Sequence, residues 1–206
     1  MRVRESAVGI AVSAVITLVL AVAGAGPAGA VIVSNPGPII IQPVQFGNGT
    51  STPYPSTITV GGLTGCTVSD INVTLRGVSH TFPDDIDVLV AGPQGQSALL
   101  MSDAGGGPDL SGVNLTFDDE AAVTLPDSAQ IVSGSYRPTN FLTITDFFPA
   151  PAPPAPRGMT LSVFDGTNPN GTWSLYVMDD STFSDAGSIS GGWSLDISTN
   201  CPAADL

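Results

Sequence analysis

The residues with the clearest chemical potential are the aspartates in the stretch His80 to Gly95. Asp84, Asp85 and Asp87 open an apolar run that a Gly-Pro-Gln-Gly turn closes. In a strand, whose side chains alternate between two faces, Asp85 and Asp87 would share one face with Leu89. The core face would hold Ile86, Val88 and Val90. Adjacent carboxylates on one face need a counter-charge, a metal ion or solvent, and the sequence leaves these three alternatives open.

Calcium is the metal that such a group would bind, because it takes six to eight oxygen ligands from carboxylates, carbonyls and water. The spacing does not fit an EF-hand loop, so separate loops would have to supply the ligands. The candidate metal ligands are Asp84, Asp85, Asp87, Asp103, Asp118 and Asp119. The alternative is that these aspartates cap turns by accepting backbone N–H groups. For a second acidic group, Asp179, Asp180 and Asp185, we expect a solvated loop.

The chain offers little for nucleophilic catalysis. His80 is its only histidine, and it contains no Gly-x-Ser-x-Gly elbow. A structural histidine near a strand end is the favoured interpretation, and we expect a chain that is not an enzyme.

Charge and hydropathy limit the partners. Arg2 and Arg4 followed by an apolar run and Ala28-Gly29-Ala30 predict a signal peptide over residues 1–30, cleaved near Ala30, and therefore a secreted protein. Its removal leaves three arginines against seventeen acidic residues, and so a formal charge of −14. Such a surface argues against nucleic acid and anionic membranes as partners, and no later apolar run is long enough to span a membrane.

Cys66 and Cys201 are the only cysteines. In an oxidising compartment, an isolated pair favours a disulfide bridge that ties the first strands to the last.

Short alternating runs between Gly, Pro, Asn and Asp predict an all-β fold, a two-sheet β-sandwich or jelly roll. Residues 31–56 are expected to be an extended leader, 57–201 the domain and 202–206 a tail. The expected strands are 57–60, 67–75, 86–91, 98–102, 113–117, 160–164, 171–178 and 188–198. Similar Trp-Ser-Leu motifs at Trp173 and Trp193 predict two neighbouring antiparallel strands with buried indoles. The Pro-rich segment Phe147 to Arg157 is interpreted as a surface loop.

Two ordered blocks resemble the P domain (Homo B domain) of proprotein convertases. The first is His80-Thr, then Asp85-Ile-x-Val-x-Val and Pro93-x-Gly95; the second is Asn168-Pro-Asn-Gly-Thr-Trp173, followed by Gly187 and Trp193. The resemblance implies a galactose-binding-domain-like jelly roll without catalytic residues, which stabilises a protease or mediates contacts. This chain departs from the pattern at Pro83, Asp84 and Gly92, which makes the stretch more acidic and weakens any inference of convertase-like docking.

The first functional hypothesis is therefore a secreted, non-catalytic module that binds a protein or surface partner and is stabilised by calcium. The second is a carbohydrate-binding module with an exposed aromatic rim: Tyr54, Tyr136, Phe141, Phe147 and Phe148. A third, an accessory domain of a secreted subtilisin-like serine endopeptidase, follows from the resemblance alone.

Overall fold

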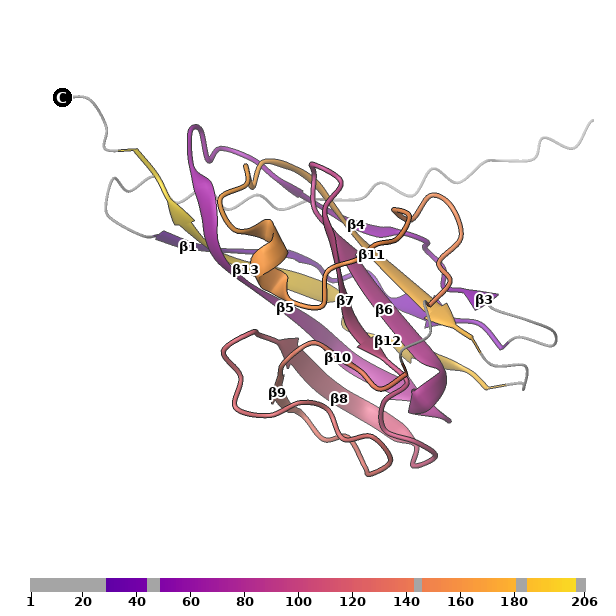
Figure 1. The fold of residues 1–206 in the computed structure, drawn as a ribbon. Helices are drawn as coiled ribbons and strands as arrows, with labels where there is room; N and C mark the ends of the chain where they lie inside the picture. The colour runs from indigo at the N-terminus through magenta and orange to yellow at the C-terminus, as the bar shows by residue number, and fades with distance from the viewer. Residues whose placement is uncertain (1–28, 44–48, 143–145, 181–184, 203–206) are drawn as a thin grey trace, which may run out of the picture.

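The computed structural model describes residues 29–43, 49–142, 146–180 and 185–202. These residues form two mixed β-sheets packed face to face, which confirms the predicted all-β sandwich (Figure 1). The predicted signal peptide before residue 29 and the tail from 203 to 206 lie outside the described residues. No helix in the described part of the chain has the length and apolar character needed to cross a membrane.

The first sheet is built around the long strand β5 (Thr67–His80). On one side, β13 (Trp193–Asn200) and β12 (Gly187–Ile189) pair with successive parts of β5. β1 (Gly29–Asn35) lies beyond β13, and β2 (Ile39–Ile41) lies beyond β12. On the other side, β5 pairs with β8 (Leu110–Phe117), which also pairs with β9 (Gly134–Tyr136).

The second sheet has the order β10–β7–β6–β11 at its centre. These strands are β10 (Thr139–Asn140), β7 (Ser97–Ser102), β6 (Ile86–Ala91) and β11 (Gly171–Asp179). Two strands share the outer edge of β11: β3 (Gly49–Thr50) and β4 (Ser56–Val60). Short 3₁₀ helices η1 (Pro83–Asp85) and η2 (Leu161–Phe164) lie between strands. The strand predicted for 160–164 is therefore wrong, because η2 occupies most of it.

The predicted pairing of the two Trp-Ser-Leu strands is also wrong. Trp173 lies on β11 and Trp193 on β13, and these strands belong to different sheets. The predicted burial is right, since both indoles are fully buried and donate hydrogen bonds, Trp173 to the Pro169 carbonyl and Trp193 to Ser56 Oγ. Strands that face each other across a core have the same alternation as strands side by side, so the pattern alone could not separate the two arrangements.

The segment expected to be a leader contributes to the sandwich. β1 pairs with β13 along its whole length, from Gly29 opposite Thr199 to Asn35 opposite Trp193. Ile39 and Ile41 of β2 are fully buried. The predicted cleavage point near Ala30 falls inside β1.

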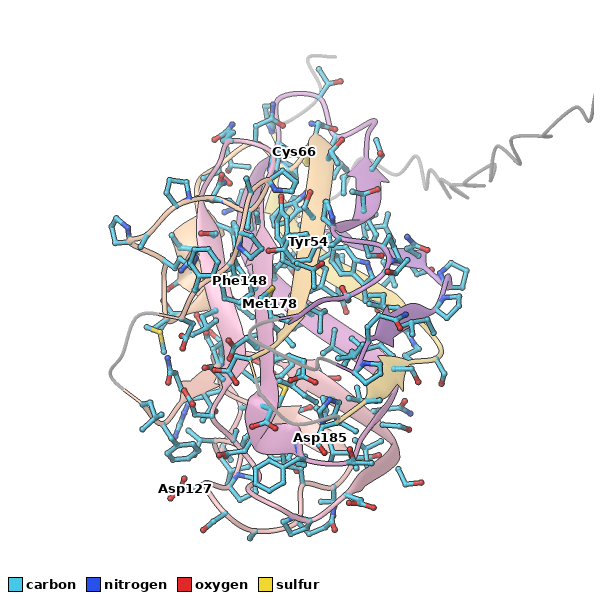
Figure 2. All side chains as sticks on the ribbon, turned by 90° about the vertical axis from the view of Figure 1, so that its right-hand side faces the viewer. Tyr54, Cys66, Asp127, Phe148, Met178 and Asp185 are labelled. Atoms are coloured by element: carbon cyan, nitrogen blue, oxygen red, sulfur yellow. A yellow bond between two sulfur atoms is a disulfide. The ribbon has the colours of Figure 1, made fainter. Side chains whose placement is uncertain are left out.

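The disulfide between Cys66 and Cys201 is present, as predicted, across a sequence separation of 135 residues. It lies at one end of the molecule, and Asp127 and Asp185 lie toward the other end (Figure 2). Joining residues so far apart in sequence restricts the unfolded chain and stabilises the sandwich by about 4–5 kcal/mol in the chain-entropy model.

The outer face of the second sheet carries its own apolar cluster. Leu89, Leu99 and Met178 of three adjacent strands are buried there, although they face away from the main core. The Pro-rich segment, residues 147–157, covers them: Phe148 packs into the cluster, and the hydroxyl of Tyr176 donates to the Pro151 carbonyl. Figure 2 shows Phe148 close to Met178 in this region. We call residues 147–157 the cover.

Candidate functional site

The aspartates of the second sheet meet because several strands have their ends at one place. β6 begins with Ile86 and Asp87 and runs antiparallel to β7 and β11, while β10 runs parallel to β7. The start of β6 therefore lies beside the ends of the other three strands. Asp103 follows β7, Asp180 follows β11, and Asp146 lies six residues after the end of β10. Asp87, Asp103, Asp146 and Asp180 are called the acidic cluster below.

Asp87 is the buried member of this cluster, with 2% of its surface exposed. The predicted alternation of β6 is right: Ile86, Val88 and Val90 enter the main core, and Leu89 enters the opposite cluster. The expectation that solvent could surround the Asp87 carboxylate is wrong, because the folded chain buries it. Its Oδ2 atom is buried without a hydrogen-bond partner.

The environment of Asp87 strongly disfavours its charged form. Burial raises the pKa of this carboxyl to about 8, against the effect of the nearby Ser102 hydroxyl, and the carboxylates of Asp180, Asp146 and Asp103 raise it further. Partial burial raises the pKa of Asp180 to about 6 although the residue is exposed in part, and Asp103 is the largest contributor among its acidic neighbours. The pKa of Asp103 is raised by burial and by Asp146, against the Ser102 hydroxyl. Each member of the acidic cluster thus lies within the electrostatic range of the other three.

Polar side chains hold the rim of the cluster. Ser102 Oγ donates to Asp103 Oδ2 at 2.9 Å, and Asn140 Nδ2 donates to Asp146 Oδ2 at 3.0 Å. Asp103 has a positive φ of 52°, a conformation that Asp tolerates better than most residues. Asp103 and Asp146 are half-buried and Asp180 is exposed, so the cluster has a buried floor and a rim open to solvent.

Asp84 and Asp85 lie on η1, next to the cluster. Asp84 Oδ1 accepts the N–H of Gly106 at 3.3 Å, and burial raises its pKa against that amide. The carbonyl of Asp85 accepts the N–H of Asp180 and so fixes the chain after β11 beside η1. Asp84 acts here as a turn cap, which is the alternative interpretation for the predicted ligands.

Asp118 and Asp119 lie elsewhere. The pairing of Phe117 with Val73 places Asp118 and Asp119 more than seven residues along β5 from His80, roughly 20 Å or more at strand spacing. Asp118 Oδ1 accepts the N–H of Glu120 at 2.7 Å. The two oxygens of Asp119 accept the N–H groups of Leu161 and Ser162 at 2.9 and 2.8 Å, at the start of η2. Both are caps, and the structure does not bring them to Asp87.

The solvated loop expected for the second acidic group is wrong for Asp179, which is fully buried at the end of β11. Its Oδ2 lies 3.4 Å from Nε2 of His80, whose side chain is buried as well. Nδ1 of His80 lies 2.9 Å from the carbonyl oxygen and 3.2 Å from the amide nitrogen of Phe82. Asp185 accepts the hydroxyl of Thr81 at 3.0 Å. His80 is therefore a core residue that fastens the turn after β5.

Sequence reasoning missed Asp146 and Asp180 as members of the cluster. The sequence predicts a solvated loop at Asp180, and Asp146 follows a two-residue strand that shows no alternating pattern. No pattern in the sequence could have found Asp180, because its place beside Asp85 and Asp87 follows from the antiparallel pairing of β6 with β11 in the fold.

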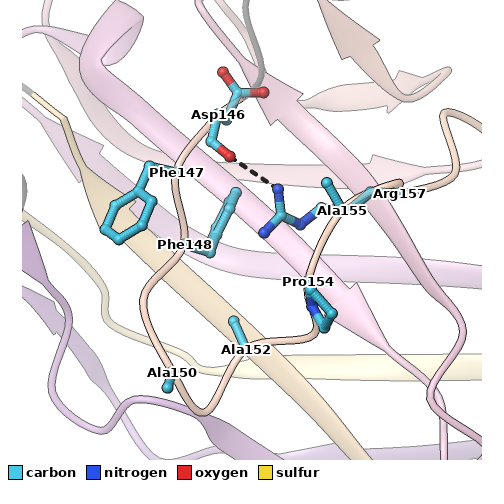
Figure 3. Close-up of a pocket in the computed structure, with 8 residues that line it drawn as sticks. All are labelled: Asp146, Phe147, Phe148, Ala150, Ala152, Pro154, Ala155 and Arg157. Atoms are coloured by element: carbon cyan, nitrogen blue, oxygen red, sulfur yellow. Dashed lines mark hydrogen bonds between the residues drawn. The ribbon is translucent and has the colours of Figure 1, made fainter.

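The cover carries the other surface feature of this region, a shallow pocket with a cavity volume of about 370 Å³. Arg157 crosses it: its guanidinium lies 4.9 Å from the centre of the Phe148 ring and donates to the carbonyls of Asp146 and Pro153. Figure 3 shows the carboxylate of Asp146 turned away from Arg157. That carboxylate therefore remains available to the acidic cluster.

The aromatic rim proposed from the sequence is not formed. Tyr136 and Phe148 are buried, and Tyr54 is half-buried against Tyr176. Of the five aromatics, Phe147 and Phe141 are the exposed ones. The prediction failed because the alternation of short irregular segments does not show which face a cover will hide.

Within the described segments, no three His, Cys, Asp or Glu side chains stand ready as ligands of one metal ion. Comparison with models of known protein families and with curated proteins gave no match.

Proposed function

We propose that this chain is an exported, non-catalytic β-sandwich module of the P type that acts by binding a protein partner. The burial of His80 carries the proposal. Because the chain's only histidine is 2% exposed and packed against Asp179, it is out of reach of a substrate, which argues against a histidine-dependent mechanism. The disulfide supports export, since such bonds persist in oxidising compartments.

The cover is the partner surface that the geometry supports best. Phe147 is 64% exposed beside the pocket, while its neighbour Phe148 anchors the segment in the apolar cluster. An exposed aromatic on an anchored, proline-stiffened segment is typical of a binding surface, because little conformational entropy is lost when a partner covers it.

A photo-crosslinking experiment tests this surface. A benzophenone side chain at Phe147 should give discrete adducts with proteins of the secreting cell. The same group at Ile32, which is 65% exposed on the other sheet, is the matched control and should not. Equal labelling from both positions, or none from Phe147, would count against the proposal.

Carbohydrate binding is the second candidate, and the exposure of Phe147 and Phe141 is the observation that favours it. The test is retention on a panel of immobilised polysaccharides, with Phe147→Ala as the variant. If the wild type is retained on a polysaccharide and this variant is not, carbohydrate binding is favoured. If the wild type is retained on none of them, carbohydrate binding is excluded as the function.

The accessory role toward a subtilisin-like protease rests on the sequence resemblance alone. It predicts that the purified chain raises the thermal stability of such a protease from the same cell, and unchanged melting of the mixture would exclude this role.

Calcium is the cofactor we propose for the module.

A further inference from the structure

We propose that Asp87, Asp103, Asp146 and Asp180 form a calcium-binding site at the end of the second sheet. The inference rests on the calcium part of the proposed function and changes its ligands. It retains Asp87 and Asp103 from the set expected from the sequence and adds Asp146 and Asp180. Asp118 and Asp119 drop out because they cap turns elsewhere, and Asp84 because its carboxylate caps Gly106.

The first argument is convergence. Four segments far apart in sequence bring one carboxylate each to the same place, because β6 starts where β7, β10 and β11 end. Mutual repulsion makes such an arrangement costly without a compensating positive charge. None of the three arginines of the described chain pairs with these carboxylates. Arg157 donates to the backbone carbonyls of Asp146 and Pro153, while the Asp146 carboxylate is turned away from it (Figure 3). Arg137 donates to the Ala121 carbonyl, and Arg76 lies on the first sheet.

The second argument is the unpartnered oxygen at the floor. Asp87 is buried to 98% of its surface, and its Oδ2 has no hydrogen-bond partner, although buried polar atoms in folded proteins almost always have one. Asp87 lies on the face of β6 that also carries Leu89, beside Ser102 and the other three carboxylates. A cation held at the rim would satisfy this oxygen.

The donor set favours calcium over other metals. All donors are oxygens, and Ser102 can add a hydroxyl to the four carboxylates. Calcium accepts such irregular sets of six to eight oxygens, whereas magnesium requires near-octahedral geometry and keeps most of its waters. Zinc would need nitrogen or sulfur ligands; the only histidine is engaged with Phe82 and Asp179, and both cysteines are in the disulfide.

Binding requires a rearrangement at the rim. In the part of the chain that the structure describes, no three acidic side chains are set for a metal, and two rim carboxylates are turned toward Ser102 and Asn140. These rim side chains are half-buried or exposed, so a change of rotamer is open to them, while Asp87 keeps its place.

The test is calorimetric titration of calcium into the chelator-treated protein, with thermal melting in parallel. We expect one site per chain and, at 100 times the dissociation constant, a rise in Tm of roughly 5–10 °C. Asp87→Asn should weaken binding at least tenfold. Asp118→Asn, which removes the same charge from a turn cap, should bind as the wild type does. Asp180→Asn, at the exposed rim, serves if Asp87→Asn does not fold, and should also bind at least tenfold more weakly.

Absence of binding heat and of a Tm shift in the wild type would overturn the site. So would equal losses in the Asp87 and Asp118 variants, since general surface charge would then explain the effect. Equal responses to magnesium would overturn the choice of calcium. Crosslinking from Phe147 tests the proposed function separately. Adducts without calcium binding would support the binding module and contradict the calcium site. Calcium binding without adducts would support the site and contradict the binding surface.

Discussion

Asp87 and Asp119 are the same residue type in opposite situations. Asp119 lies in a connection between strands and uses both oxygens to accept the first N–H groups of η2. Asp87 lies inside a strand whose neighbouring backbone groups are already paired across β7 and β11, and one of its oxygens accepts nothing. Where loops leave backbone amides unpaired, a carboxylate stabilises the fold; where a sheet uses them all, the same group needs a proton or a cation.

The largest expected difference between Asp87 and Asp119 is the effect of each on how the free energy of unfolding depends on pH. The folded-state pKa values of Asp87, about 8, and Asp180, about 6, lie above the ordinary carboxyl value of 3.8. The folded protein therefore binds protons more tightly than the unfolded chain, and stability falls as the pH rises from about 4 to about 8 and then levels off. In chelator, we expect a loss on the order of 4 kcal/mol, dominated by buried Asp87. Urea unfolding at several pH values measures it, and a free energy that does not fall across this range would contradict the contrast.

The next effect is that of Asp87→Asn. In chelator at pH 8, the variant should unfold with a free energy higher by on the order of 3 kcal/mol, because it removes a buried charge that lacks compensation. Its stability should fall less with pH over this range than that of the wild type, because Asp180 then accounts for most of the remaining dependence. Urea titration of both proteins checks this, and a destabilised variant would show that the carboxylate already has adequate partners.

Asp119→Ala should have the opposite sign. It leaves the N–H groups of Leu161 and Ser162 without acceptors and should lower the free energy of unfolding by about 1–2 kcal/mol. Asp119→Asn, which retains one acceptor oxygen, is the control and should lose less. The loss of stability should be the same with calcium and with chelator. A loss that depends on calcium would mean that Asp119 is coupled to the acidic cluster, from which the structure separates it.

Asp118→Asn should have the smallest effect, within about 0.5 kcal/mol, because an amide oxygen can still accept the N–H of Glu120. Thermal melting with calcium and with chelator should match the wild type in each condition. A larger change would mean that Asp118 does more than cap its turn.

The sequence predicted the fold class more completely than it predicted the residues of the candidate site. Alternation in β5 and β6 and the two cysteines were sufficient to predict an all-β sandwich closed by a Cys66–Cys201 disulfide. Strand partners were not predictable in the same way, because Trp173 and Trp193 have identical patterns whether their strands pair or face each other. The site depends on those partners. Asp180 and Asp146 could be joined to Asp87 only when β11 and β10 had been placed next to β6 and β7.

The burial of Asp87 was hidden for a related reason. An alternating strand indicates which side chains share a face, and it does not show what lies over that face. Here the cover packs over the apolar cluster on the outer face of the second sheet, and Asp87 on the same face is 2% exposed. Whether that face is buried depends on how segments distant in the sequence pack, and a local pattern of residues does not encode such packing.

The most direct test of the account is a crystal structure of the protein grown in calcium, with anomalous scattering used to locate the ion. The account predicts one anomalous peak within 2.3–2.6 Å of an Asp87 carboxylate oxygen, with further ligands from Asp103, Asp146 and Asp180. A peak at Asp118 and Asp119, or no peak at the acidic cluster at saturating calcium, would contradict it.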